Sequence, residues 1–255
     1  MYSIAGAVFF VNTSYTRYEC IRPSAILFGI SVTMETQQPD SFTLKDLFKP
    51  EHRYSLLGAF FLLCLAYIAE HFANLYEIAY SLRPTSTYVG DLLLDNLPVV
   101  NLNFIIIEGA LLSIVVGTIF VLLRPRYVLF ALKSLALFVA IRALFVSLTH
   151  VGIYPGSINP GAGILDGIYT YLNFQTGFFF SGHTALPFLM ALIFWEERPA
   201  RIVLLSLSFV FGTAVLLAHI HYSIDVFAAP FMAYGIFNIA RHLFPHDWEL
   251  IEGGF

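Results

Sequence analysis

The chain has 255 residues, of which 58% are hydrophobic and 12% are charged, and its formal net charge at pH 7 is −4. With a mean hydropathy of +0.76, this composition excludes an ordinary soluble domain and predicts an integral membrane protein. The two cysteines, Cys20 and Cys64, offer neither a disulfide framework nor metal-ligand spacing, and no nucleotide-binding glycine pattern or zinc-binding histidine pattern occurs. We therefore expect no metal, no cofactor and no nucleic-acid partner.

The first 53 residues differ from the rest, and we expect them to form an N-terminal cytoplasmic segment. Its apolar stretch over 4–11 lacks a basic leader and is too short to cross a membrane, so it makes a poor signal peptide. Met34 begins a more conventional start, and a short amphipathic piece follows over 44–48. Two interpretations of residues 1–33 stay open: a spurious or disordered extension, and an anchor helix lying on the membrane surface.

Six apolar stretches follow, each close to the roughly 20 residues that a membrane-spanning helix needs. They cover 54–72, 98–123, 127–148, 177–195, 200–218 and a last stretch from the region of 219 to about 243. The sequence thus predicts an all-α, polytopic membrane protein with six transmembrane helices over 54–243 and a short C-terminal tail over 244–255.

Loop charges predict how these helices are oriented. Basic residues precede the first stretch, separate the second from the third and the fourth from the fifth, and close the sixth, whereas the opposite loops hold only Arg83. The residues on the basic side are Lys45, Lys49, Arg53, Arg124, Arg126, Lys133, Arg198, Arg201 and Arg241. By the positive-inside rule both termini are cytoplasmic.

Two polar islands interrupt the apolar sequence, at 180–184 and at 219–226. If the stretches between them cross the membrane, both islands return to the same, outer face. His221 and Asp225 are four residues apart, so on a helix they stack on one face, where the carboxylate fixes the imidazole tautomer. His219 lies off that face, and we interpret it as structural.

Two motifs resemble the signatures of the sphingomyelin synthase family, within the PAP2-related superfamily of lipid phosphatases and phosphotransferases. They are Ser181-Gly182-His183-Thr184 and His221-Tyr222-Ser223-Ile224-Asp225-Val226. Arg142 with Thr149 resembles the arginine-bearing third helix of that family, and Asp91, Asp95 and Glu108 resemble an acidic spacing before and inside its second helix. The resemblance covers roughly 85–242 and implies a PAP2-like helical bundle core.

The departures from the known patterns favour the synthase-like branch. The hydrolytic branch carries Lys-x6-Arg-Pro, a proline before Ser-Gly-His and a Ser-Arg pair ahead of the second histidine. In this chain Phe180 stands in place of that proline, Ala214-Val215 replace Ser-Arg, and the lysine-led motif is missing. The synthases in turn usually carry Cys-Gly-Asp ahead of Ser-Gly-His, where this chain has Thr176-Gly177-Phe178, so the head group stays open.

The resemblance implies three catalytic residues, His183, His221 and Asp225. His221, oriented by Asp225, would attack the phosphorus of a phospholipid head group and form a phosphohistidine. His183 would protonate the departing diacylglycerol oxygen and then deprotonate the hydroxyl of an acceptor lipid.

The predicted substrate-binding residues are Arg142, Ser181, Tyr222 and Glu108. Arg142 is the expected phosphate clamp, because an arginine inside a membrane helix is costly and usually faces a polar cavity or partner. A structural ion pair between Arg142 and Glu108 is the alternative.

The predicted function is transfer of a phospho-alcohol head group from a phospholipid donor to a ceramide-like or diacylglycerol-like acceptor at the outer face. Two alternatives stay open. One is a PAP2-type lipid phosphatase or phospholipase C-type hydrolase, and the other is a non-enzymatic transporter or scaffold. The donor head group, the acceptor and the oligomeric state are open as well.

Overall fold

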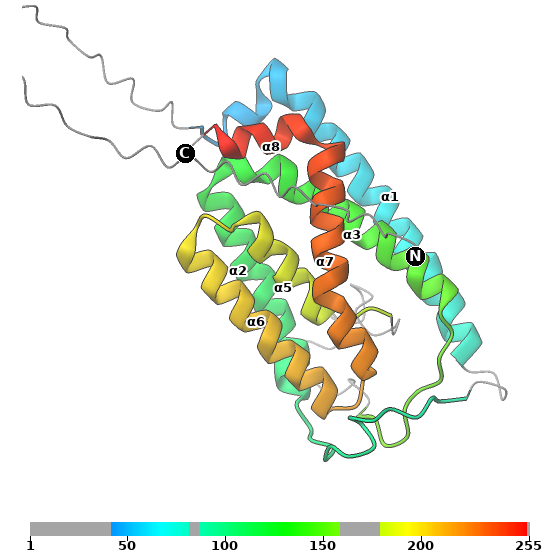
Figure 1. Ribbon diagram of the computed structural model, residues 1–255. Helices are drawn as coiled ribbons and strands as arrows, with labels where there is room; N and C mark the ends of the chain where they lie inside the picture. Colours follow the sequence, from blue (N-terminus) through cyan, green and yellow to red (C-terminus); the bar gives the residue numbers. More distant parts are fainter. Residues whose placement is uncertain (1–41, 82–86, 159–178, 254–255) are drawn as a thin grey trace, which may run out of the picture. The chain divides into compact units, whose positions relative to one another are not determined.

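The computed structural model describes residues 42–81, 87–158 and 179–253, and each regular element in these ranges is helical (Figure 1). The predicted all-α fold class is therefore confirmed. The interpretations of residues 1–33 lie outside the described residues.

Each of the six predicted apolar stretches contains a helix. Five helical segments are long and apolar enough to cross a membrane, and α5 is a shorter apolar helix. The helices of these stretches are α1 (Pro50–Ser81), α2 (Ala110–Leu123) preceded by the π-helical η2 (Ile105–Gly109), α3 (Val128–Leu148), the shorter α5 (Gly182–Ile193), α6 (Arg198–Leu217) and α7 (Ser223–Leu243). Short 3-10 turns, η1 (Asp46–Phe48) and η3 (Pro125–Tyr127), precede α1 and α3.

The prediction for the fourth stretch was too long at both ends. α5 has 12 residues, which reach about 18 Å and cover little more than half of a bilayer's hydrocarbon core. Ser181 is extended, with ψ at 113°, and its backbone N–H donates to the carbonyl oxygen of Asp225 at 3.1 Å. Because the Ser181 N–H bonds to this distant residue, α5 begins at Gly182 and not one turn earlier.

Consecutive spanning helices run in alternate directions (Figure 1). The N-terminal ends of α1, α3 and α6 therefore meet at one end of the bundle, which we call the α8 end because α8 (Pro245–Glu252) lies there. An ion pair at 2.7 Å between Arg124 after α2 and Glu197 before α6 ties two loops together at this end. The N-terminal ends of α5 and α7 meet at the other end, which we call the α5–α7 end.

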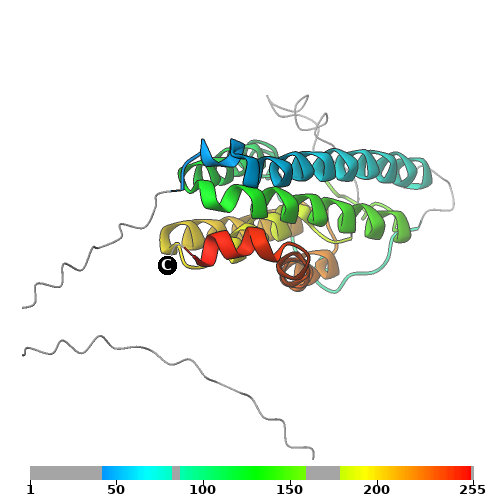
Figure 2. The same cartoon turned by 90° about the horizontal axis from the view of Figure 1, so that it is seen from above.

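Close packing inside the bundle depends on small residues. α1 packs along α3, as Figure 2 also shows, and α5 packs on α6 and α7. Ala229, Ala233 and Ala240 lie on one face of α7 and are fully buried. Small side chains allow membrane helices to approach closely, so that van der Waals contacts stabilise the bundle.

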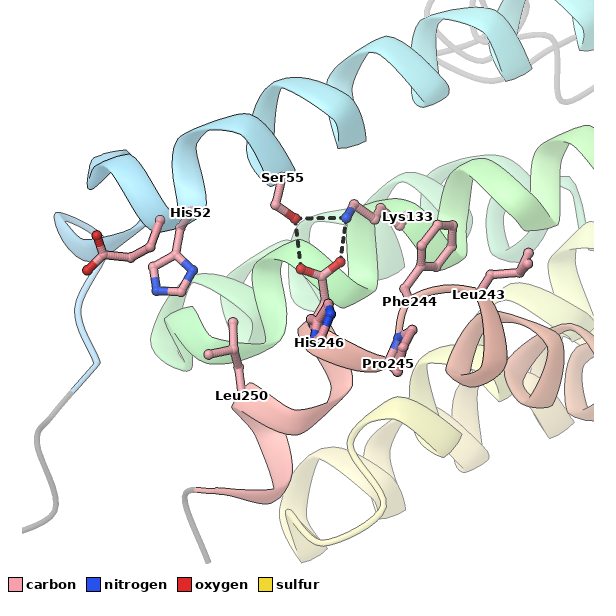
Figure 3. A pocket seen from close by; sticks show the side chains of 10 residues that line it. His52, Ser55, Lys133, Leu243, Phe244, Pro245, His246 and Leu250 are labelled. Atoms are coloured by element: carbon pink, nitrogen blue, oxygen red, sulfur yellow. Dashed lines mark hydrogen bonds and ion pairs between the residues drawn. The ribbon is translucent and has the colours of Figure 1, made fainter.

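The segment expected to be a tail, 244–255, contains α8, which is tied to the bundle by a partly buried polar cluster (Figure 3). Lys133 Nζ of α3 donates to Asp247 Oδ2 at 2.5 Å and to Ser55 Oγ of α1 at 2.7 Å. Ser55 Oγ donates in turn to Asp247 Oδ1 at 2.7 Å. Because one carboxylate contacts α1 and α3 together, this cluster joins three helices at the α8 end.

Candidate active site

The two predicted catalytic histidines face each other at the α5–α7 end. His183 is the second residue of α5, and His221 lies two residues before the start of α7. Their ring centroids are 6.3 Å apart, with an angle of 69° between the planes. The hydrogen bond from the Ser181 N–H to the Asp225 carbonyl holds the two motifs together. The polar islands, about 40 residues apart in the sequence, thus form one site.

His221 and Asp225 are in contact, although the local structure differs from the prediction. His221 Nδ1 lies 3.5 Å from Asp225 Oδ2, and both residues are buried. The prediction that both residues lie on one turn of a helix was wrong, because His221 precedes α7 in a non-helical backbone. Asp225 is the third residue of α7, and its carboxylate turns back to accept the Tyr222 N–H at 3.0 Å. A carboxylate in the first turn stabilises the N-terminus of the helix. It can still orient the imidazole ring of His221.

His183 has contacts of its own with η2 and α6. Its side chain makes a hydrogen bond with the backbone of Ile106 in η2. The ring centroid of Phe211 in α6 lies 6.2 Å from the ring centroid of His183. π-Helical turns are rare in proteins as a whole, but many of those that occur lie at functional sites. The backbone of η2 thus orients His183, whereas the side chain of Asp225 orients His221.

Arg142 reaches the first motif from α3. A Cβ atom at Gly182 would lie 3.4 Å from Arg142 Nε, so the guanidinium group lies beside the residue directly before His183. Arg142 is 9% exposed, and its Nη1 forms an ion pair with Oε1 of Glu70 on α1. Glu70 is thus an ion-pair partner of Arg142 that the sequence analysis did not consider, since it weighed Glu108. Glu108 is a half-buried residue of η2.

Glu70 is a site residue that the sequence analysis missed. A signal for it exists in α1, where Glu70, Asn74 and Glu77 recur at intervals of four and three residues inside an apolar helix. These three side chains are 8%, 3% and 2% exposed. Their spacing marks one polar face, and a polar face on a membrane helix points to a buried partner.

The hydroxyl groups of Ser181 and Tyr222 both make hydrogen bonds within the protein. Ser181 is fully buried, and its Oγ accepts the Thr184 hydroxyl at 3.3 Å. The Tyr222 hydroxyl donates to the Gly152 carbonyl oxygen at 2.7 Å and accepts the Val89 N–H at 3.3 Å. These contacts position both side chains, and their substrate-binding role stays a prediction.

His219 ends α6 in a way that explains its conformation. Its φ of 56° is left-handed. The His219 N–H bonds to the Leu216 carbonyl, and the Ile220 N–H bonds to the Val215 carbonyl, which is the Schellman pattern of a helix C-terminus. His219 is 3% exposed and its ring packs edge-on against Tyr154. These contacts agree with the structural interpretation of this histidine.

A pocket of about 510 Å³ lies at the α8 end (Figure 3). His52, Lys133 and Asp247 are among its lining residues, and none of the predicted site residues belongs to the lining. Within the parts of the chain that the structure describes, no group of three or more His, Cys, Asp or Glu side chains could hold a metal ion.

Residues 176–243 match the family model described as PAP2 superfamily C-terminal. This segment includes both motifs and the helices α5, α6 and α7, whereas Arg142 and Glu70 precede it. A comparison with curated proteins finds no match. Over residues 176–243 the chain is therefore similar to the PAP2 superfamily, a similarity that is compatible with lipid phosphatase or phosphotransferase activity.

Proposed function

We propose that the protein is a multi-pass membrane phosphotransferase that moves a phospho-alcohol head group from a phospholipid to a ceramide-like or diacylglycerol-like lipid alcohol. The observation that carries this proposal is the facing pair of His183 and His221, each held by a partner of its own. A double displacement needs one nucleophile and one proton-transfer group within reach of the same phosphorus atom. The short distance of 6.3 Å between the ring centroids supports a site in which both imidazoles reach one phosphoryl group.

In the first step a His221 nitrogen attacks the phosphorus, and the bond from phosphorus to the diacylglycerol oxygen breaks. Protonated His183 donates its proton to that oxygen, and diacylglycerol leaves. In the second step neutral His183 takes the proton of the acceptor hydroxyl, whose oxygen attacks the phosphorus and breaks the bond to His221. Asp225 faces Nδ1 and so leaves Nε2 as the attacking atom.

The charges around the histidines favour a phosphodiester over a phosphomonoester. A terminal phosphate carries close to two negative charges and needs several cations, whereas a diester carries one. Arg142 is the cation that lies against Gly182, and Glu70 already balances its charge. In the part of the chain that the structure describes, this arginine with its charge balanced by Glu70 favours a singly charged head group over a phosphate dianion.

The test uses the purified full-length protein in vesicles with a head-group-labelled phospholipid, with and without added ceramide or diacylglycerol. We expect label to appear on the acceptor lipid, with diacylglycerol released in equal amount when ceramide is the acceptor and little free phosphate formed. Rapid release of phosphate or phospho-alcohol that is independent of any acceptor would overturn the transferase and favour the hydrolase. Absence of turnover with every donor, alongside intact folding, would favour the non-enzymatic alternative.

A further inference from the structure

We infer that Asp91 is a positioning residue for His221, acting through the backbone of Ser223 from a loop that lies outside the PAP2-like segment. This inference rests on the proposed catalytic role of His221. Asp91 belongs to the connection between α1 and η2, 130 residues before the histidine, and its side chain does not need to touch the reacting atoms to act in this way.

The first contact that carries the inference is a hydrogen bond to the start of α7. The Ser223 N–H donates to Asp91 Oδ2 at 2.7 Å. Ser223 is the first residue of α7, and its N–H is one of the groups that a helix leaves without an internal acceptor. Because Asp91 accepts this N–H, Asp225 can direct Oδ2 to Tyr222 and His221.

Asp91 is itself held firmly in its loop. Its other oxygen, Oδ1, accepts the N–H groups of Leu93 and Leu94 at 3.0 and 3.2 Å, and the residue is 7% exposed. Burial by itself would raise the pKa of Asp91, and the hydrogen bonds from Ser223, Leu94 and Leu93 offset this effect, so that the pKa lies below its ordinary value. The carboxylate thus stays charged and can stabilise the positive end of the α7 dipole.

Tyr222, which lies between His221 and Ser223, is also held by residues of the loops. The Tyr222 hydroxyl bridges the Val89 N–H and the Gly152 carbonyl. Gly152 lies close to the backbone of Thr87, which is possible because glycine has no side chain. A Cβ at this position would lie 2.7 Å from the carbonyl carbon of Thr87. Both residues after His221 are therefore bound to loops that precede η2 or follow α3.

This arrangement leads to a specific expectation for catalysis. His221 lies in a non-helical backbone, so its ring position depends on where Tyr222 and Ser223 are held. Loss of the Asp91 contact would move the imidazole relative to Asp225 and His183 without removing any group that binds the lipid. Because a displacement of about 1 Å can lower a rate by about 100-fold, kcat should fall while KM stays nearly constant.

The experiment compares Asp91→Ala and Asp91→Asn with Asp95→Ala in the full-length protein in vesicles. Asp95 is an exposed acid of the same loop, whose carboxylate accepts the Tyr154 hydroxyl, and it serves as the matched control. We expect Asp91→Ala to lower kcat by about 10-fold to 100-fold, with KM within about two-fold of the wild type. Asp91→Asn keeps an oxygen acceptor and should lie between Asp91→Ala and the wild type. Equal kinetic constants for Asp91→Ala and Asp95→Ala, or a loss confined to KM, would overturn the inference.

A second measurement separates this inference from the proposed function. Hydrogen–deuterium exchange of the peptide covering 219–226 should become faster in Asp91→Asn and stay unchanged in Asp95→Ala, whether or not the vesicles show head-group transfer. Unchanged exchange in Asp91→Asn would refute the positioning role. If exchange rises in Asp91→Asn while the wild type shows no turnover, the positioning of the loop holds and the proposed reaction fails.

Discussion

Arg142 of α3 is ion-paired with Glu70 of α1 while its guanidinium group lies against Gly182, the residue before His183. The two partners are 72 residues apart in the sequence, and neither lies in the segment that matches the PAP2 superfamily. A helix outside this segment therefore sets the position of the cation beside the first motif.

This relationship predicts that stability and catalysis respond differently to changes at the pair. Arg142→Leu leaves Glu70 buried without its ion-pair partner, which should lower the free energy of unfolding by about 3–5 kcal/mol. The double variant Glu70→Leu/Arg142→Leu removes both charges and should recover most of that stability. If Arg142 binds the phosphate, head-group transfer should stay about 100-fold reduced or more in both variants.

Thermal unfolding in detergent and initial rates in vesicles measure the two effects. Glu108→Gln is the matched control for an acid in a neighbouring helix, and it should lower transfer much less than Arg142→Leu. Recovery of transfer in the double variant would show that the arginine is structural and does not hold the phosphate.

The second prediction concerns the histidine–carboxylate pair. His221→Ala and Asp225→Asn should each lower turnover by about 10²–10⁴-fold, with a larger loss for the nucleophile. Asp225→Asn keeps an oxygen that can accept the Tyr222 N–H, so its melting temperature should change little. Initial rates and melting temperatures of the two variants test this separation of catalysis from helix capping.

His219→Gly is the control for that pair. Glycine favours the left-handed conformation that His219 adopts at the end of α6, so the α6 terminus should form normally. Most of the turnover should remain. A loss as large as that of His221→Ala would mean that His219, and not only His221, takes part in catalysis.

The third prediction concerns the polar cluster at the α8 end. Lys133→Ala leaves the buried carboxylate of Asp247 without its ion-pair partner, and the protein should lose about 3–5 kcal/mol of stability. Ser55→Ala removes only a hydroxyl group from the same cluster and should cost about 1 kcal/mol. Denaturation in detergent gives both values.

The same variants test whether the α8 end takes part in catalysis. The turnover of the folded fraction should be unchanged in Lys133→Ala, because the cluster and the facing histidines lie at opposite ends of the bundle. A reduced kcat in fully folded Lys133→Ala would link the two ends.

The fourth prediction is the membrane orientation. In a protein whose native cysteines are replaced, Ile153→Cys should react with an impermeant thiol reagent on intact cells. Glu196→Cys should react only after the membrane is opened, because it lies in the turn beside the basic residues Arg198 and Arg201. Both positions are exposed, so accessibility within the protein does not bias the comparison. The reverse labelling pattern would place the histidines on the cytoplasmic side.

The hydropathy of the sequence by itself determined the all-α class and the approximate place of each membrane helix. This information is local, because an apolar stretch in a membrane must form helix wherever it lies in order to satisfy its backbone hydrogen bonds. The two motifs were also recognisable locally, since His183, His221 and Asp225 lie within short polar islands of an apolar chain. Helix ends were less predictable. α5 begins only at Gly182 because Ser181 bonds to Asp225, a contact with a residue far along the chain.

Only the tertiary structure decided which partner each site residue has. Sequence spacing predicted a helical stack for His221 and Asp225, but the contact forms across a helix N-terminus, where the carboxylate turns back toward Tyr222. Spacing also gave no reason to join Arg142 to Glu70 or Ser223 to Asp91, because these pairs depend on how α1 and the loop before η2 pack against the rest of the bundle. In a low-dielectric interior a charge or an open N–H must find a partner, and the packing of distant segments determines which partner is within reach.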